Sequence, residues 1–89
     1  MYLHLGQDVV VLLSSVVGIF DIEITSQSRL TRRFLEDAEK SGSVVNIGQE
    51  LPKSFAVCVE NGKTTVYISQ ISTATLLKRC RSAYDWHDS

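Results

Sequence analysis

The stretch from residue 53 to residue 69, KSFAVCVENGKTTVYIS, constrains the fold more than any other part of the chain. Two runs rich in β-branched and aromatic residues flank Asn61-Gly62, and both of these residues tolerate the positive φ angles of a tight hairpin turn. Because successive side chains of a strand point to opposite faces, alternate residues of each run share a face. The sequence therefore predicts a central β-hairpin whose apolar residues include Phe55, Val57, Val59, Val66 and Ile68.

The first 24 residues predict three strands. Residues 1–5 alternate polar with apolar side chains, and residues 6–8 form a turn. The continuous apolar run over 9–13 is typical of a strand buried on both faces. From residue 16 we expect a further strand that extends to Ile24, because Phe20, Ile22 and Ile24 alternate with Asp21 and Glu23. One face of this strand would meet water or a basic partner surface.

Two helices are predicted in the rest of the chain. The first begins near Ser28, after several possible capping residues over 25–28, and ends near Lys40 before Ser41-Gly42. Its apolar stripe contains Leu30, Phe34, Leu35 and Ala38. A short strand over 44–47 and a loop over 48–52 lead to the hairpin. The second helix starts at Ser72 or Thr73, and its apolar stripe contains Ile71, Ala74, Leu77, Cys80 and Tyr84.

The chain length and the pattern of elements predict one α+β domain. The 89 residues suffice for a small domain over 1–84, with a mainly antiparallel sheet, the central hairpin and two helices; residues 85–89 form a C-terminal tail. The net charge of −1 indicates neither nucleic acid nor a membrane as partner. Two cysteines without a C-x-x-C spacing favour a reduced, cytoplasmic setting, and the longest apolar run, 9–13, is too short to span a bilayer.

No residue pattern indicates catalysis, a metal or a cofactor. The two cysteines, Cys58 and Cys80, have no histidine nearby in the sequence, so they are more simply interpreted as buried or half-buried packing residues. His4 and His87 lie near opposite ends of the chain, and the paired spacing of a tetrahedral metal site is missing. The glycines stand alone in turns rather than in a phosphate-binding loop. We therefore expect no enzyme activity.

Two clusters of basic residues are the stronger candidates for a binding site. Arg29, Arg32 and Arg33 lie on the first two turns of the first predicted helix, where the helix dipole already favours phosphate. In one interpretation the three arginines contact the phosphate backbone of DNA. In the other they form a solvated helix face whose charge is neutralised by Glu36 and Asp37. The same two interpretations apply to the second cluster, which contains Lys78, Arg79 and Arg81.

The stretch LPKSFAVCVENGKTTVYISQISTATLLKR resembles the bacterial RemA/RemB family of extracellular matrix regulators. MYLHLGQD, the GIFD run and TSQSRLTRRFLEDA are similar to its RemB branch, so that the resemblance covers essentially the whole chain. It implies a small subunit that assembles into a homo-oligomeric ring. It also implies a DNA-binding transcriptional regulator linked to matrix (biofilm) genes, in which basic residues repeated around the ring bend or wrap double-stranded DNA.

The chain departs from the family pattern at its basic residues. RemA-like sequences carry an arginine pair in the loop before the hairpin, where this chain has Leu51-Pro52-Lys53. The family's arginine near the end of the second strand has no match in the uncharged stretch 15–19. The predicted DNA contacts are therefore Lys53 together with Arg29, Arg32 and Arg33, the arginines being chosen from charge clustering alone. The alternative is an oligomeric scaffold that co-assembles with a RemA-like paralogue without binding DNA.

Overall fold

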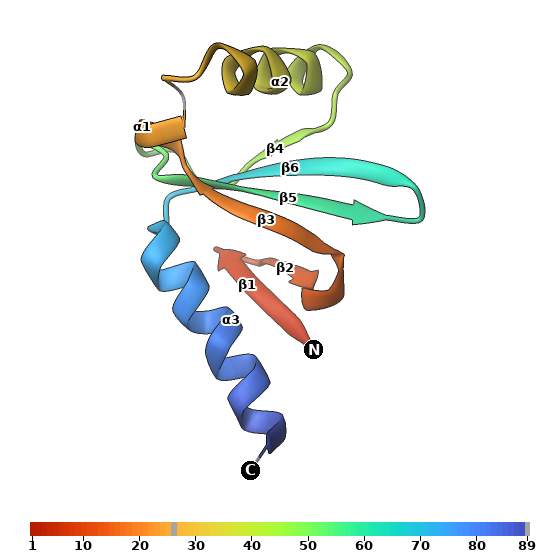
Figure 1. Cartoon of the computed structure of the whole chain (residues 1–89), viewed down its shortest axis with the longest axis vertical. Coiled ribbons are helices and arrows are strands. Elements are labelled where there is room, and N and C mark those ends of the chain that lie inside the picture. Colours follow the sequence, from red (N-terminus) through yellow and green to blue (C-terminus); the bar gives the residue numbers. More distant parts are fainter. Residues whose placement is uncertain (26, 89) are drawn as a thin grey trace.

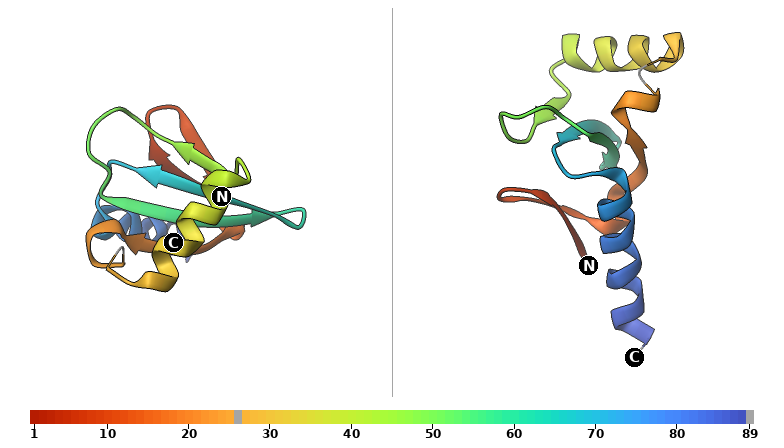
Figure 2. Two further views of the ribbon diagram at one scale, coloured as in Figure 1. Left: turned by 90° about the horizontal axis from the view of Figure 1, so that it is seen from above. Right: turned by 90° about the vertical axis from the view of Figure 1, so that its left-hand side faces the viewer.

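A four-stranded sheet in the order β3-β5-β6-β4 forms the middle layer of the molecule. In the computed structural model, which describes residues 1–25 and 27–88, α2 covers one face of this sheet, and α3 and a separate β1-β2 hairpin cover the other (Figures 1 and 2). In chain order the elements are β1 (Tyr2–Gly6), β2 (Val9–Leu12), the 3-10 turn Leu13–Ser15, β3 (Val16–Asp21), α1 (Ile22–Thr25), α2 (Arg29–Lys40), β4 (Val44–Asn46), β5 (Ser54–Glu60), β6 (Lys63–Ser69) and α3 (Thr73–Asp88).

The predicted central hairpin is confirmed. β5 and β6 pair antiparallel along their whole length, from Ser54 opposite Ser69 to Glu60 opposite Lys63. Asn61 and Gly62 form the turn with φ angles of 53° and 77°, the left-handed pair that a two-residue turn of this kind requires. β3 adds antiparallel to β5, whereas β4 runs parallel to β6, so the sheet is mainly antiparallel.

The face of the sheet under α2 holds the smaller part of the core. Phe55 and Val66 are buried there against Ala38 of the helix. Leu35 and Val44 are half-buried at the margin of this cluster. The hairpin residues that the sequence assigned to one apolar face therefore do pack together, except that Val59 lies beyond the helix and stays exposed.

The opposite face holds the larger part of the core. Leu3 and Leu5 of β1 are fully buried against Ala56, Cys58 and the helix residue Leu76. The alternation predicted over residues 1–5 is therefore correct. The buried pattern predicted over 9–13 is wrong, because β2 pairs only with β1 in a two-stranded sheet whose other side is open to solvent, and Val10 is exposed.

Two buried serines join the layers at the end of the hairpin that lies away from the turn. The hydroxyl of Ser69 donates to the carbonyl of Leu5 over 2.6 Å and accepts the N–H of Ile71 over 3.0 Å. The hydroxyl of Ser54 donates to the carbonyl of Ile71 over 2.7 Å. The hairpin, the N-terminal strand and the segment that leads into α3 are thus connected through side-chain hydrogen bonds.

The strand predicted to reach Ile24 ends earlier. A carboxylate oxygen of Asp21 accepts the N–H of Ile24 over 3.0 Å, and the chain turns into the one-turn helix α1. Asp side chains compete with strand pairing through such local bonds. The predicted alternation is therefore wrong beyond Phe20: Ile24 lies in solvent, and the structure has a third helix that the sequence did not indicate.

The first long helix begins and ends as predicted. Ser28 is the N-cap, and its hydroxyl accepts the N–H of Thr31 over 3.5 Å; Ser26, another predicted capping residue, lies outside the described residues. Gly42 adopts a φ of 73° directly after the helix. The expected apolar stripe is only partly covered, because Ala38 is buried while Leu30 and Phe34 remain exposed.

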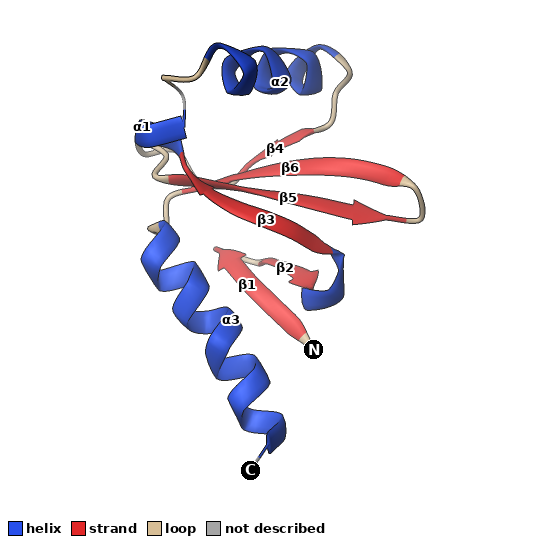
Figure 3. Cartoon of the chain, in the orientation of Figure 1, coloured by secondary structure: helices blue, strands red, loops and turns tan. Residues whose placement is uncertain are grey.

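The last helix differs in its register and its length. Leu76 is completely buried, whereas Leu77, which the sequence placed in the apolar stripe, is 48% exposed. Ala74 is exposed as well, and the side chain of Tyr84 lies outside the described residues. The helix also continues to Asp88, through the segment expected to form a tail (Figure 3). The boundary of the domain at residue 84 remains a prediction.

The edge strand β3 carries an irregularity. Its register against β5 shifts between Val16 and Gly18, so that Val17 bulges outward and is exposed. A Cβ on Gly18 would lie 2.7 Å from the ring of Phe20, so the ring could keep this position only above a glycine. Phe20 stacks on Phe55 of the neighbouring strand with 5.1 Å between ring centroids. The bulge and the glycine together fix the position of this aromatic pair.

The register of α3 predicts a sharp difference between two adjacent leucines. We expect Leu76→Ala to lower the free energy of unfolding by about 2–5 kcal/mol, because it leaves a cavity in the larger core. Leu77→Ala, the matched control, should cost less than about 1 kcal/mol. Urea unfolding followed by circular dichroism measures both. Equal losses, or a larger loss for Leu77→Ala, would contradict the observed register.

Candidate nucleic-acid interface

The three arginines of α2 lie on its side away from the sheet. Thr31, Leu35 and Ala38 face the sheet, and Arg29, Arg32 and Arg33 are all exposed. At about 100° of rotation per residue, the three arginines span an arc of about 100° on the outward side of the helix. The structure therefore brings these predicted residues together on one convex surface.

The electrostatic setting of these arginines is unbalanced. The first turn of α2 contains no acidic residue, so the positive end of the helix dipole adds to their charge rather than being offset. Among the described residues, no ion pair joins the three guanidinium groups to a carboxylate, although Glu36 and Asp37 follow on the same helix. This surface is suited to an anionic partner.

Lys53 lies on a different element from the arginines. Its backbone N–H donates to the carbonyl of Ser69 over 2.9 Å, and its carbonyl accepts the N–H of Ile22 over 3.1 Å. The second of these bonds places Lys53 beside α1, and α1 leads within a few residues to the start of α2 (Figure 1). Lys53 and the arginines thus share one end of the molecule, although no described hydrogen bond or ion pair connects their side chains.

The loop before the hairpin is firmly anchored. When the Gln70 amide is oriented with its oxygen toward the loop, the orientation that pairs this oxygen with donors, the oxygen accepts the N–H groups of Gln49 over 2.7 Å and Glu50 over 2.5 Å. Gly48, with a φ of +86°, passes directly beneath this amide, and any Cβ there would collide with it. The loop exposes an acid and an apolar side chain, Glu50 and Leu51, and Leu51-Pro52-Lys53 stands where the family resemblance implies an arginine pair.

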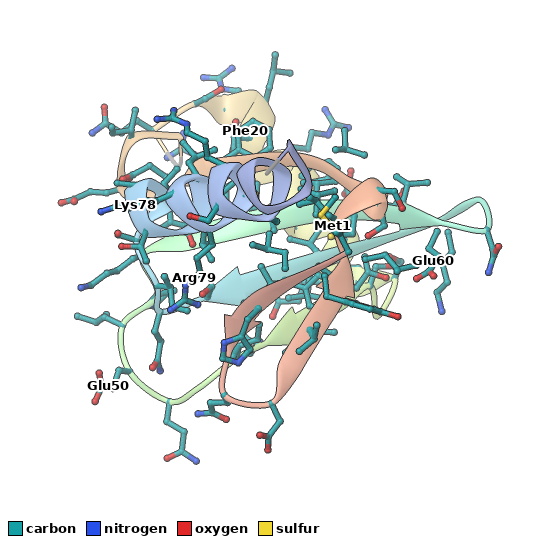
Figure 4. All side chains as sticks on the ribbon, turned by 90° about the horizontal axis from the view of Figure 1, so that it is seen from below. Met1, Phe20, Glu50, Glu60, Lys78 and Arg79 are labelled. Carbon is teal, nitrogen blue, oxygen red and sulfur yellow. The ribbon has the colours of Figure 1, made fainter. Side chains whose placement is uncertain are left out.

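The second basic cluster is partly structural. The guanidinium group of Arg79 donates to the carbonyl of His4 over 3.0 Å and so ties α3 to β1. Lys78 and Arg81 are exposed on the same helix, and Figure 4 shows Lys78 and Arg79 on α3. At least one of the three charges is therefore used for packing the helix rather than for a partner.

Known proteins resemble the chain over almost its whole length. The family model described as extracellular matrix regulatory protein A-like matches residues 2–80. The extracellular matrix regulatory protein B of Bacillus subtilis (strain 168) is 36% identical over 85 residues, which are 96% of each chain. The chain belongs to the RemA-like family. Its similarity to the B protein also confirms the RemB-like character that the sequence indicated.

Other chemistry gains little support from this RemA-like structure. Among the side chains that the structure describes, no three His, Cys, Asp or Glu residues form a group that would hold a metal ion. No helix in this described part is long and apolar enough to cross a membrane. The family is a regulatory one by its description. Neither cysteine lies beside a described histidine that would activate it, so the absence of an enzyme site remains our expectation.

The two cysteines are held in their neutral form. Burial raises the pKa of the Cys58 thiol; a hydrogen bond with Ser15 lowers it by less, and the Glu60 charge raises it further. Burial also raises the pKa of Cys80. A raised pKa keeps the thiol protonated, and thiolates rather than thiols act as nucleophiles. These residues therefore contribute packing, as the sequence indicated.

The Cys58 environment predicts a loss of stability in alkaline solution. The pKa of Cys58 is higher in the folded chain than its ordinary value of 9.0, so as the pH rises the thiol of the unfolded chain loses its proton first. The stability that this difference affects is therefore complete below pH 9.0 and declines as the pH rises from there toward the pKa of the folded chain. We expect the free energy of unfolding to fall above about pH 9 in the native chain, and to fall less steeply in Cys58→Ala. Urea titrations across that range measure both slopes, and identical slopes would contradict this assignment.

Proposed function

We propose that the chain is a non-enzymatic, ring-forming DNA-binding regulator of extracellular matrix (biofilm) genes. In this proposal Arg29, Arg32, Arg33 and Lys53 contact the phosphates of double-stranded DNA. The proposal takes its regulatory part from the family description and from the name of the Bacillus subtilis relative. Its DNA-binding part rests on the surface of α2.

One observation carries the DNA-binding part: three exposed arginines without ion-pair partners among the described residues, at the positive end of a helix without an acidic residue in its first turn. Such an arrangement is electrostatically unfavourable in the isolated protein, because cations at a helix N-terminus oppose the dipole. A phosphate backbone relieves this repulsion and adds the entropy of released counterions. This surface carries charge but forms no pocket for a base. It therefore favours contacts with the phosphate backbone of DNA over contacts with the edges of the bases.

Ring formation makes weak contacts sufficient. A single subunit supplies only a few phosphate contacts, and binding at physiological salt requires more. Copies arranged around a ring act on one duplex, so the later contacts form at high effective concentration. Several large apolar side chains of this small domain are exposed, which supports association: Tyr2, Val17, Ile24, Leu30 and Leu51 are the most exposed of them.

A second candidate function is a scaffold subunit that co-assembles with itself or with a RemA-like paralogue and does not bind DNA. The loop before the hairpin favours it, since Leu51-Pro52-Lys53 offers one positive charge where the family resemblance implies an arginine pair, and the neighbouring Glu50 is acidic. The net charge of −1 also weakens long-range attraction to DNA. The two functions differ in one measurable property, the salt-dependent affinity for a duplex.

The arginine surface predicts the effect of charge reversal. We expect Arg29→Glu combined with Arg32→Glu to weaken binding to a long duplex by at least about tenfold at about 50 mM salt, and to reduce the salt dependence of binding. Both changes place acids near the positive end of α2, so they should not lower thermal stability. Electrophoretic mobility shifts and thermal melts measure the two effects.

The matched control is Lys78→Glu combined with Arg81→Glu, which changes the net charge equally on the opposite side of the sheet. This control should retain most of the affinity. If the control loses binding and the α2 variant keeps it, the DNA contact lies on α3 and the site assignment is wrong. If the native chain fails to bind the duplex at low salt, the scaffold function replaces DNA binding.

A further inference from the structure

An apolar groove lies between α2 and the edge of the sheet. Its volume is about 280 Å³, and it is lined by Phe20, Leu30, Thr31, Phe34, Phe55 and Val57. Leu30 is 81% exposed, and Phe34 and Phe20 are 41% and 39% exposed. Three aromatic rings and two aliphatic side chains thus form a surface depression with almost no polar character.

The groove exists because α2 does not cover the whole face of the sheet. The helix packs through Leu35 and Ala38 on the side of β5, β6 and β4. Between Phe20 of β3 and the first turns of α2 the groove stays open, and Gly18 contributes no side chain to fill it. Contiguous exposed apolar surface of this kind marks an interaction site, because covering it removes apolar area from water.

The same chain displays an apolar side chain that fits such a groove. Leu51 is 88% exposed, yet it lies in an anchored loop. Gln70 fixes the backbone just before it, and the N–H of Lys53 bonded to Ser69 fixes the backbone just after it. Pro52 stiffens the segment further. A leucine held in this way loses little conformational freedom when it enters an apolar site.

The charges beside the leucine and beside the groove are complementary. Glu50 is exposed next to Leu51, and among the residues flanking the groove Arg33 lies about 60° from Leu30 around α2. A carboxylate on the incoming loop would meet this guanidinium group. In the assembled ring Arg33, which the proposed function also places on DNA, would then face Glu50 first. Arg29 and Arg32 lie further around the outward arc and would remain fully available to DNA.

The loop and the groove of one molecule do not meet. Figure 4 shows Glu50 and Phe20 well apart, on different sides of the molecule. The two surfaces therefore combine only between copies, and each copy carries one surface of each kind. Contacts of this kind run head to tail, and they close into rings when the rotation between neighbours permits.

We propose that the Glu50-Leu51 loop of one copy inserts into the α2-β3 groove of the next, with Leu51 against Leu30, Phe34 and Phe20 and with Glu50 beside Arg33. This proposal rests on the ring-forming part of the proposed function and names the surfaces that build it. The partner is a second copy of this chain.

Two single variants separate the halves of the contact. Leu51→Asp removes the inserting side chain and keeps the groove, whereas Leu30→Asp damages the groove and keeps the loop. Both leucines are highly exposed, so thermal melts should stay close to the native chain. Burial of a leucine is worth at least about tenfold in association, so each variant alone should dissociate at concentrations where the native chain is assembled. Light scattering after size-exclusion chromatography measures the masses.

Mixing the two variants gives the decisive result. The intact loop of Leu30→Asp should enter the intact groove of Leu51→Asp, and the resulting 1:1 dimer cannot grow because its remaining loop and groove are damaged. A mixture that stays monomeric overturns the proposal. Normal assembly of Leu51→Asp alone, with loss of assembly in Leu30→Asp, would show that two grooves meet each other and would also overturn it.

A charge exchange tests the position of Glu50. Glu50→Arg should weaken assembly several-fold, and adding Arg33→Glu should restore it; a further loss in the double variant contradicts this pairing.

All masses are measured without DNA. A native chain that is monomeric at working concentration would refute both the ring and this contact. An assembled native chain whose variants also assemble would refute only this contact.

Discussion

The hydroxyl of Ser69 joins layers that are otherwise held mainly by apolar packing. The β1-β2 hairpin is a separate two-stranded sheet, and such a hairpin is only marginally stable alone. Ser69 bonds to the carbonyl of Leu5 at the end of β1 and receives the N–H of Ile71 at the approach to α3. Because Ser69 and Leu5 are both fully buried, the Leu5 carbonyl would have no access to water if it lost this bond. The position of the larger core therefore depends on one small polar side chain at the end of the central hairpin.

The sequence predicted those parts of the fold that depend on local interactions. Asn61-Gly62 determines the hairpin because both residues allow positive φ angles, and Ser28 begins α2 because its hydroxyl accepts the N–H of Thr31 in the first turn. Prediction failed where two local preferences compete. Asp21 continues an alternating pattern but also caps a helix, and the cap prevails. Likewise Leu76 and Leu77 fit two registers of an apolar stripe, and only packing against β1 and β5 selects one of them.

The candidate site shows the same division. The clustering of Arg29, Arg32 and Arg33 is visible in the sequence, because Arg29 lies three and four positions before the other two, and residues at these spacings are neighbours on a helix surface. The anchored loop is not visible, since Gln70 lies about twenty residues beyond it and reaches it only in the folded chain. Gly48 and Pro52 at the two ends of the loop were the available signals. In the loop where the family resemblance implies positive charge, the fold exposes an acid beside a leucine.

The bulge at Val17 limits how this protein associates. An edge strand with regular pairing groups invites another strand to extend the sheet, and such growth has no natural end. Register on β3 is broken between Val16 and Gly18, and the opposite edge, β4, is only three residues long. Backbone-to-backbone extension is therefore disfavoured at both edges. Side-chain contacts would then have to join any copies of this chain, and such contacts can close into an assembly of defined number instead of growing into fibres.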